Sequence, residues 1–241
     1  MIQENFIKIY EESFKKNWEL PALTDYSKGT TFSFADVAKE IARIHIMFEE
    51  CQIRRGDKIA LIGKDSARWC IVYMAAVTYG AIVVPILQDF SPNDVHHIIN
   101  HSESVFLFVS DRIWDTLEEE MIEDVRGVFS LSDFRCLHQR DGESIQKLLK
   151  GMDEKMAEKY PDGFGKDDIK YAELDNDKVV EINYTSGTTG FPKGVMLTHY
   201  NIANNGFLTG EHMKFTADDK LCCCVPLFHC FGVVLASMNV L

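Results

Sequence analysis

The stretch Tyr184-Thr185-Ser186-Gly187-Thr188-Thr189-Gly190-Phe191-Pro192-Lys193-Gly194 combines four aliphatic hydroxyls, three glycines and one lysine. Glycines let a backbone take positive φ and approach a ligand closely. Successive main-chain N–H groups in such a turn form an anion-binding concavity, to which Thr and Ser hydroxyls add donors. Since Lys193 supplies a full positive charge, we predict a phosphate cradle. On composition alone, a solvated hairpin or surface loop fits equally well.

The order of residues separates these two interpretations. A Walker A loop has glycine directly before its lysine and Ser or Thr after it, whereas here Pro192 precedes Lys193 and Gly194 follows it. The order instead closely resembles the signature loop of the adenylate-forming superfamily, which includes acyl-CoA synthetases, nonribosomal-peptide adenylation domains and luciferases. Further stretches similar to that superfamily lie at residues 30–36, 55–60, 75–85 and 226–232.

Composition limits the classes of function. The chain has 241 residues, of which 46% are hydrophobic and 26% charged, and this is typical of a globular protein of one or two domains. Its net charge is -12, and no basic stretch is interleaved with aromatic residues, so we expect no nucleic-acid partner. An anionic substrate must therefore be received by a local patch such as Lys193.

The cysteines and the first residues indicate a compartment. Seven cysteines without a CxxC pair, together with a polar start unlike a secretory leader, predict a reducing, cytoplasmic environment. No run approaches the roughly 18 apolar residues of a membrane span.

Apolar segments alternate with helical patterns along the chain. Continuous apolar strands of this kind predict an α/β fold, with a Rossmann-like wound parallel sheet covered by helices on both faces. We expect a short extended piece at the start of residues 30–36, and strands at 58–62, 81–85, 105–109, 128–131, 179–184 and 221–225. We expect helices at 5–18, 33–48, 65–80, 91–100, 111–121, 143–160, 232–241 and from about 198, with Ser33 and Asp36 forming a capping box.

Two features of the sequence predict the domain organisation: a loop at residues 161–168 and the apolar last residues, 232–241. Residues 161–168 are the clearest loop and suggest two sublobes, about 1–165 and 166–241, of one large amino-terminal domain. Residues 232–241 end inside an apolar run without a cap. From this we expect an incomplete domain, a fragment of a longer protein whose carboxy-terminal domain is absent. We expect this fragment alone to be inactive as a ligase and to bind ATP weakly at most.

The resemblance implies a two-step reaction. A carboxylate attacks the α-phosphorus of ATP to give an acyl-adenylate and pyrophosphate, and a thiol, usually that of CoA, then displaces AMP. It implies that the phosphates are held by Thr185, Ser186, Gly187, Thr188, Thr189, Gly190 and Lys193, with Thr185 also touching Mg²⁺. The implied partners are ATP, CoA, a fatty acid and the missing domain of the same chain; a fatty substrate would be compatible with peripheral contact with a membrane.

The histidines and clustered cysteines have alternative interpretations. Because His229 lies on a short apolar segment, it fits a histidine of the core. The resemblance instead implies that His229 lines the acyl pocket. We expect no general-base role for it, because the carboxylate of the acid substrate is already ionised at neutral pH. We expect His199 to seat the first turn of a helix capped by Thr198. The cysteines at 222–224 and 230 favour buried structural residues over a zinc site, because adjacent strand residues point to opposite faces.

The substrate and the acceptor remain open at this point. Leu197-Thr198-His199 and Pro226-Leu227-Phe228-His229 look most like fatty-acyl-CoA ligases of the long-chain type. Two alternatives stand beside an acyl-CoA ligase. One is an acyl-AMP ligase or adenylation domain that loads a carrier protein, and the other is a non-catalytic nucleotide-binding module.

Overall fold

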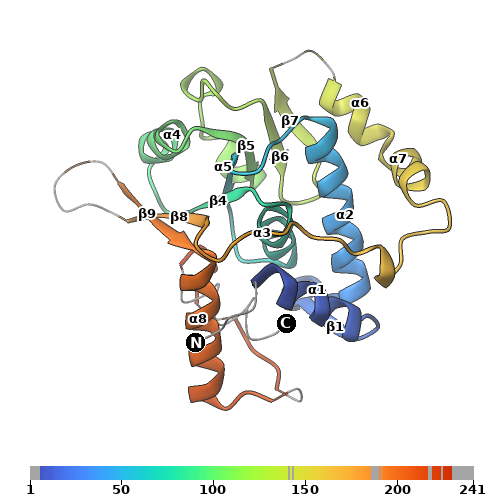
Figure 1. Cartoon of the computed structure of the whole chain (residues 1–241). Helices are drawn as coiled ribbons and strands as arrows, with labels where there is room; N and C mark the ends of the chain where they lie inside the picture. Colours follow the sequence, from blue (N-terminus) through green and yellow to red (C-terminus); the bar gives the residue numbers. More distant parts are fainter. Residues whose placement is uncertain are drawn as a thin grey trace.

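The computed structural model describes residues 6–140, 142, 144–185, 190, 192–216, 219–223 and 225–229. A seven-stranded sheet runs through the molecule in the order β7-β6-β5-β3-β4-β8-β9 (Figure 1). A short hairpin of β1 (Pro21–Asp25) and β2 (Thr30–Ser33) lies outside that sheet. These features confirm the predicted α/β fold class.

The centre of the sheet is parallel. It consists of β3 (Lys58–Ile62), β4 (Ile82–Ile86), β5 (Ser104–Val109), β6 (Gly127–Ser130) and β8 (Val179–Thr185). The two edge strands, β7 (Cys136–Gln139) and β9 (Lys193–Thr198), pair antiparallel with β6 and β8. Because the inner strands are buried on both faces, their continuous apolar runs made them recognisable in the sequence.

Helices cover both faces of this sheet (Figure 1). One core cluster joins the sheet to α1 (Phe6–Lys16), α2 (Phe34–Glu50), α3 (Ala67–Tyr79), α6 (Ser144–Lys150), α7 (Met152–Lys159) and α8 (His199–Met213). The other cluster joins it to α4 (Pro92–His101) and α5 (Asp111–Trp114). Short 3-10 turns lie at Tyr26–Lys28, Glu119–Met121 and Lys166–Asp168.

Local signals fix the ends of several helices. Ser33 and Asp36 form the predicted capping box at the start of α2. Ser66 caps α3, and Gly80 ends that helix with a φ of 91°, a left-handed conformation that glycine adopts without steric cost. Ser91 caps α4, whose first residue is Pro92.

Three predicted elements are wrong. The single helix at 143–160 is two helices, α6 and α7, separated at Gly151. The helix at 111–121 is only the four-residue α5 followed by the turn at Glu119–Met121. The strand at 221–225 is not formed, because residues 221–223 are neither helical nor paired with the sheet.

Cys222 and Cys223 are exposed, so the expectation that the clustered cysteines are buried is wrong for these two. Cys224, Cys230 and the helix predicted at 232–241 lie outside the described residues. Three strands, β1, β7 and β9, were not expected. In the part of the chain that is described, no helix is long and apolar enough to span a membrane.

The loop at 161–168 connects α7 to the second half of the chain. After it, β8 joins the same sheet and pairs in parallel with β4, through Val83 and Glu181. The division into sublobes at 165 and 166 stays a prediction.

Candidate active site

The signature stretch includes the connection between β8 and β9, at the turn end of this hairpin. Thr185 is paired directly with Lys193, and both side chains are exposed. Side chains that face each other across an antiparallel pair lie on the same face of the sheet. The hydroxyl of Thr185 and the ammonium of Lys193 therefore flank the mouth of the loop from one side.

The loop itself is described only in part. Gly190 has a φ of 133°, a backbone conformation that L side chains rarely adopt. Four of the predicted phosphate-binding residues, Ser186, Gly187, Thr188 and Thr189, lie outside the described residues. Of the predicted phosphate ligands, the structure thus places Thr185, Gly190 and Lys193 on one hairpin.

A buried polar network runs along β8 below this mouth. Alternate residues of a strand share a face, so Glu181, Asn183 and Thr185 lie on one side of β8. The Asn183 Nδ2 donates to Glu181 Oε1 at 3.0 Å, and the Tyr73 hydroxyl, from α3, donates to Glu181 Oε2 at 2.8 Å. Both Glu181 and Asn183 are buried.

This network holds the segment Pro226-Leu227-Phe228-His229 against the sheet. The Asn183 Nδ2 also donates to the Phe228 carbonyl at 3.0 Å. The backbone N–H of Leu227 donates to Asp65 Oδ1 at 3.0 Å. Asp65 follows β3 and Asn183 lies near the end of β8, and both strands run in the same direction as β4. The segment is therefore docked at the carboxyl edge of the parallel strands.

The position of His229 follows from this docking. Its side chain is exposed, and its backbone N–H donates to the Pro226 carbonyl at 3.2 Å. Ligands of open α/β sheets bind at the carboxyl ends of the strands. The structure thus brings His229 to the same edge of the sheet as Thr185 and Lys193, where its side chain is exposed.

The opposite face of the hairpin packs against α4. The Tyr184 hydroxyl and His101 Nδ1 are 2.7 Å apart and share a hydrogen bond. Tyr184 pairs across the hairpin with Gly194, where an added Cβ would lie 2.8 Å from Ile182 Cγ2 and 3.1 Å from Tyr184 Cζ. Only glycine fits this position without displacement, so the close approach fixes the base of the loop.

Burial dominates the electrostatics of the inner groups. It raises the pKa of Glu181 to about 7, against which the hydrogen bonds from Tyr73 and Asn183 favour the ionised form. Burial lowers the pKa of His199 to about 4. That ring lies 5.8 Å from the ring of Phe6, while Thr198 caps α8 by accepting from Asn201 N–H. His199 is thus a packing residue at the start of α8, as predicted.

Few side chains of the described site could bind a metal ion. The described residues contain no group of three His, Cys, Asp or Glu side chains that could hold a metal ion. The exposed hydroxyl of Thr185 is an oxygen donor of the kind that Mg²⁺ accepts, and Mg²⁺ is commonly bound through one or two protein oxygens and substrate phosphates. The Thr185 hydroxyl is therefore compatible with Mg²⁺ that arrives with a nucleotide.

The sequence alone did not identify the residues that dock the 226–229 segment at the carboxyl ends of the strands. These are Tyr73, Asp65, Glu181 and Asn183, none of which belongs to the signature stretch. A signal was present for two of them, because Glu181 and Asn183 are polar residues two apart in a strand that is otherwise apolar. Their partners are remote in the sequence and could be found only from the fold.

Known proteins show the same architecture and similar sequences. The acyl-CoA ligase sidI of Aspergillus fumigatus is 31% identical over 222 residues, covering 88% of this chain and 36% of that protein. The crotonobetaine/carnitine–CoA ligase of Proteus mirabilis is 28% identical over 222 residues, which cover 90% of this chain and 40% of that protein. The solved structure of the anthranilate CoA ligase AuaEII with anthranoyl-AMP has a TM-score of 0.79 at 19% identity, covering 98% of this chain and 42% of that one.

The chain spans less than half the length of these relatives. A family model described as AMP-binding enzyme matches residues 10–241, which is nearly the whole chain. This chain belongs to the AMP-binding enzyme family, the adenylate-forming superfamily whose signature loop its hairpin carries.

Proposed function

We propose that this chain forms the ATP- and acyl-binding part of an AMP-forming acid–CoA ligase. The observation that carries the proposal is the pairing of Thr185 with Lys193 at the mouth of the signature loop, on the face of β8 where Asn183 holds the segment of His229. The two ends of the proposed phosphate-binding loop and the proposed acyl-binding segment thereby lie at one edge of one sheet. The remaining parts of the site would come from the portion of the relatives that this chain does not span.

The first half-reaction would join the acid to the α-phosphorus of ATP. A carboxylate oxygen forms the new O–P bond, the bond between the α-phosphorus and the bridging oxygen breaks, and pyrophosphate leaves with that electron pair. Since the attacking carboxylate is already ionised at neutral pH, no proton has to be removed. The rate then depends on positioning and on neutralising phosphate charge, which suits a loop of amides and hydroxyls beside Lys193.

Lys193, the residues of the signature loop and His229 have proposed roles in that step. Lys193 would neutralise the departing phosphates, and Thr185 together with Ser186, Gly187, Thr188, Thr189 and Gly190 would donate hydrogen bonds to them. When bound with ATP, Mg²⁺ supplies charge neutralisation between phosphate oxygens, and Thr185 is the residue that would touch it. His229 would line the acyl pocket beside the reacting carboxylate and orient it, without acting as a base.

In the second half-reaction the sulfur of CoA would attack the acyl carbonyl, the bond to the adenylate oxygen would break, and AMP would leave. We propose a long-chain fatty acid as the substrate, supported by the resemblance of the 197–199 and 226–229 stretches to such ligases. The proposed setting is the cytoplasm, with peripheral access to membranes that supply the acid. A carrier-protein phosphopantetheine is the alternative acceptor.

A pyrophosphate-exchange assay tests the proposal. The protein at the full length of its relatives is incubated with labelled pyrophosphate, ATP and a panel of acids from acetate to palmitate. We expect exchange that requires an acid and is fastest with long chains, followed by thioester formation with CoA. Exchange without thioester on CoA, but with transfer to a phosphopantetheinylated carrier, would favour the loading enzyme. No exchange with any acid would favour a non-catalytic nucleotide-binding module.

A further inference from the structure

A cavity of about 550 Å³ lies at the half of the sheet that does not carry the signature loop. It is bordered by α2, α6 and the turn between β6 and β7, whereas the signature loop belongs to β8 and β9 at the other edge of the sheet (Figure 1). None of its lining residues takes part in the site described above. Its volume is within the range of about 300–1,000 Å³ that small-molecule sites occupy.

The floor of this cavity is apolar and partly aromatic. Phe134 and Phe108 stand edge to face, with ring centroids 6.2 Å apart and planes at 86°. The other apolar lining residues include Ile44 and Met47 of α2, Leu149 of α6 and Met152 of α7. A floor of this kind favours the hydrocarbon or aromatic body of a ligand.

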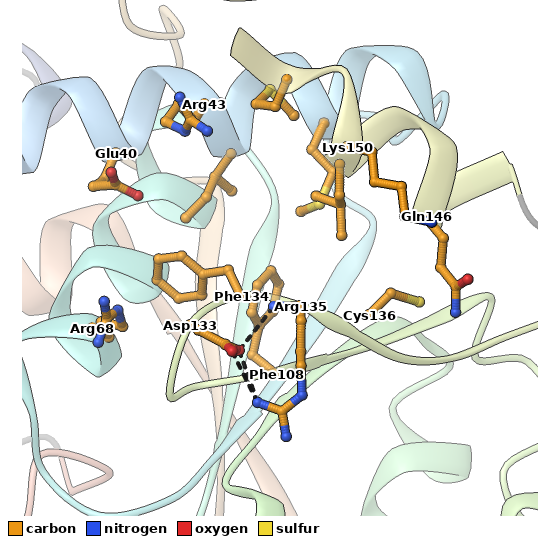
Figure 2. A pocket seen from close by; sticks show the side chains of 14 residues that line it. Glu40, Arg43, Arg68, Phe108, Asp133, Phe134, Arg135, Cys136, Gln146 and Lys150 are labelled. Carbon is orange, nitrogen blue, oxygen red and sulfur yellow. Dashed lines mark hydrogen bonds and ion pairs between the residues drawn. The ribbon is translucent and has the colours of Figure 1, made fainter.

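Phe134 reaches this position at a conformational cost. Its φ is 62°, which is a genuine outlier for a bulky residue that is not glycine. Strain of this kind persists only where the surrounding structure over-determines it, and it is concentrated at binding sites. Here the strained turn places the Phe134 ring among the side chains that line the cavity (Figure 2).

Charged side chains surround the apolar floor on three sides (Figure 2). Four of the lining residues are cationic and two are acidic, which gives the lining a charge of +2 in a chain of net charge -12. The cations are Arg43, Arg68, Arg135 and Lys150, and the acids are Glu40 and Asp133. Local charge is thus opposite in sign to the charge of the whole chain.

Two of these cations are compensated by neighbouring acids. Arg43 is 2.6 Å from Asp153, and Arg135 pairs with Asp133 at 3.0 Å and with Asp111. Arg68 and Lys150 form no ion pair with any residue that the structure describes. The Arg68 guanidinium instead lies 5.8 Å from the centroid of the Phe134 ring, which holds it over the aromatic floor.

We propose that this cavity binds an amphipathic organic anion, with its apolar body on Phe108 and Phe134 and its carboxylate or phosphate group paired with Arg68. A guanidinium presents paired N–H donors that match either anionic group. Lys150 adds positive potential from the opposite side. The inference is independent of the proposed ligase activity, since the cavity shares no residue with that site.

Calorimetric titration of this chain, without nucleotide or CoA, tests the proposal. Octanoate and octyl phosphate probe the two anionic groups, 1-octanol has the apolar body without charge, and acetate has the charge without the body. We expect one octanoate or octyl phosphate per chain, binding of 1-octanol at least tenfold weaker, and none of acetate. Equal binding of octanoate and octanol, or binding of neither octanoate nor octyl phosphate at millimolar concentration, would overturn it.

Variants locate the anion. Arg68→Gln should weaken binding about tenfold or more, and Phe134→Asn should weaken it comparably, because asparagine tolerates the left-handed backbone while removing the ring. Lys170→Gln, an exposed lysine outside the cavity, is the matched control and should stay within twofold. If Arg68→Gln and Phe134→Asn bind like the parent chain, with unchanged circular dichroism, the anion lies elsewhere and the proposal is wrong.

Discussion

The side-chain amide of Asn183 donates to the carbonyl of Phe228 at 3.0 Å, although the two residues are 45 positions apart in the sequence. The same amide donates to Glu181, so one buried side chain joins the strand of the signature loop to the segment that ends at His229. The geometry of the two halves of the proposed site therefore depends on a residue outside the signature stretch.

Replacing that amide should release the segment. In Asn183→Ala the Phe228 carbonyl and the Glu181 carboxylate lose a donor, and loss of such a partner in a buried setting costs about 1–3 kcal/mol. We expect faster amide hydrogen exchange in residues 225–229 and lower stability. The matched control is Asn205→Ala, an exposed asparagine of α8, which should leave both unchanged. Equal exchange in the two variants would show that Asn183 does not hold the segment.

Glu181 should make stability depend on pH. Burial raises its pKa from 4.5 to about 7, so the folded chain binds this proton more tightly than the unfolded chain. Its contribution to stability is therefore complete below about pH 4.5 and is lost as pH rises through 7. The difference in pKa corresponds to roughly 3 kcal/mol at 1.36 kcal/mol for a tenfold change in proton affinity.

Glu181→Gln isolates that contribution, because the other titrating groups are common to both proteins. Urea unfolding of the parent chain and of the variant between pH 4 and 8 should give a difference that grows in favour of the variant as pH rises. If the two stabilities run parallel over this range, Glu181 does not titrate in the folded state as its burial indicates.

Gly194 should not tolerate a methyl group. In Gly194→Ala the new Cβ would meet Ile182 Cγ2 at 2.8 Å and the Tyr184 ring at 3.1 Å, so the Ile182 and Tyr184 side chains must shift or the hairpin must open. Overpacking of this kind costs about 1–3 kcal/mol. In Gly151→Ala the nearest contact is 3.6 Å and φ is -95°, so that variant should keep the parent's thermal midpoint. Equal midpoints for the two variants would contradict the close packing at Gly194.

Lys193 should act on the nucleotide rather than on the acid. In the full-length protein, Lys193→Ala should lower kcat/KM for ATP by about tenfold to a hundredfold, because a charge-assisted contact to phosphate is lost. The order of preference among acids should stay the same. Lys170→Ala is the control, because it removes the same positive charge from an exposed position outside the site. If Lys193→Ala leaves both KM for ATP and kcat unchanged, Lys193 does not contact the nucleotide and its assignment to the site is wrong.

Parts of the fold could be predicted because their sequence signals are local. The inner strands such as Lys58–Ile62 are continuous apolar runs, and α2 begins with a capping box that Ser33 and Asp36 encode by themselves. The edge strand Lys193–Thr198 carries no such run, because it begins with lysine and glycine and leaves Met196 exposed. Its pairing with β8 depends on tertiary context.

The incorrect elements have equally specific causes. The charged helix expected at 143–160 is divided at Gly151, whose conformational freedom makes it a poor residue for a helix interior. The apolar residues at 221–223 have no neighbouring strand among the described residues, so apolar character alone did not make them a strand. At the site, the signature stretch identified Thr185 and Lys193. The contacts of Asn183 with Phe228, of Asp65 with Leu227 and of Tyr73 with Glu181 join residues remote in the sequence and could be found only from the fold.

A crystal structure of the full-length protein with a non-hydrolysable ATP analogue tests the proposed function most directly. We expect the β- and γ-phosphates within hydrogen-bond distance of the loop between Thr185 and Lys193, with the α-phosphorus facing the segment that ends at His229. A structure in which this loop is free of nucleotide and the analogue is bound elsewhere would contradict the proposed function.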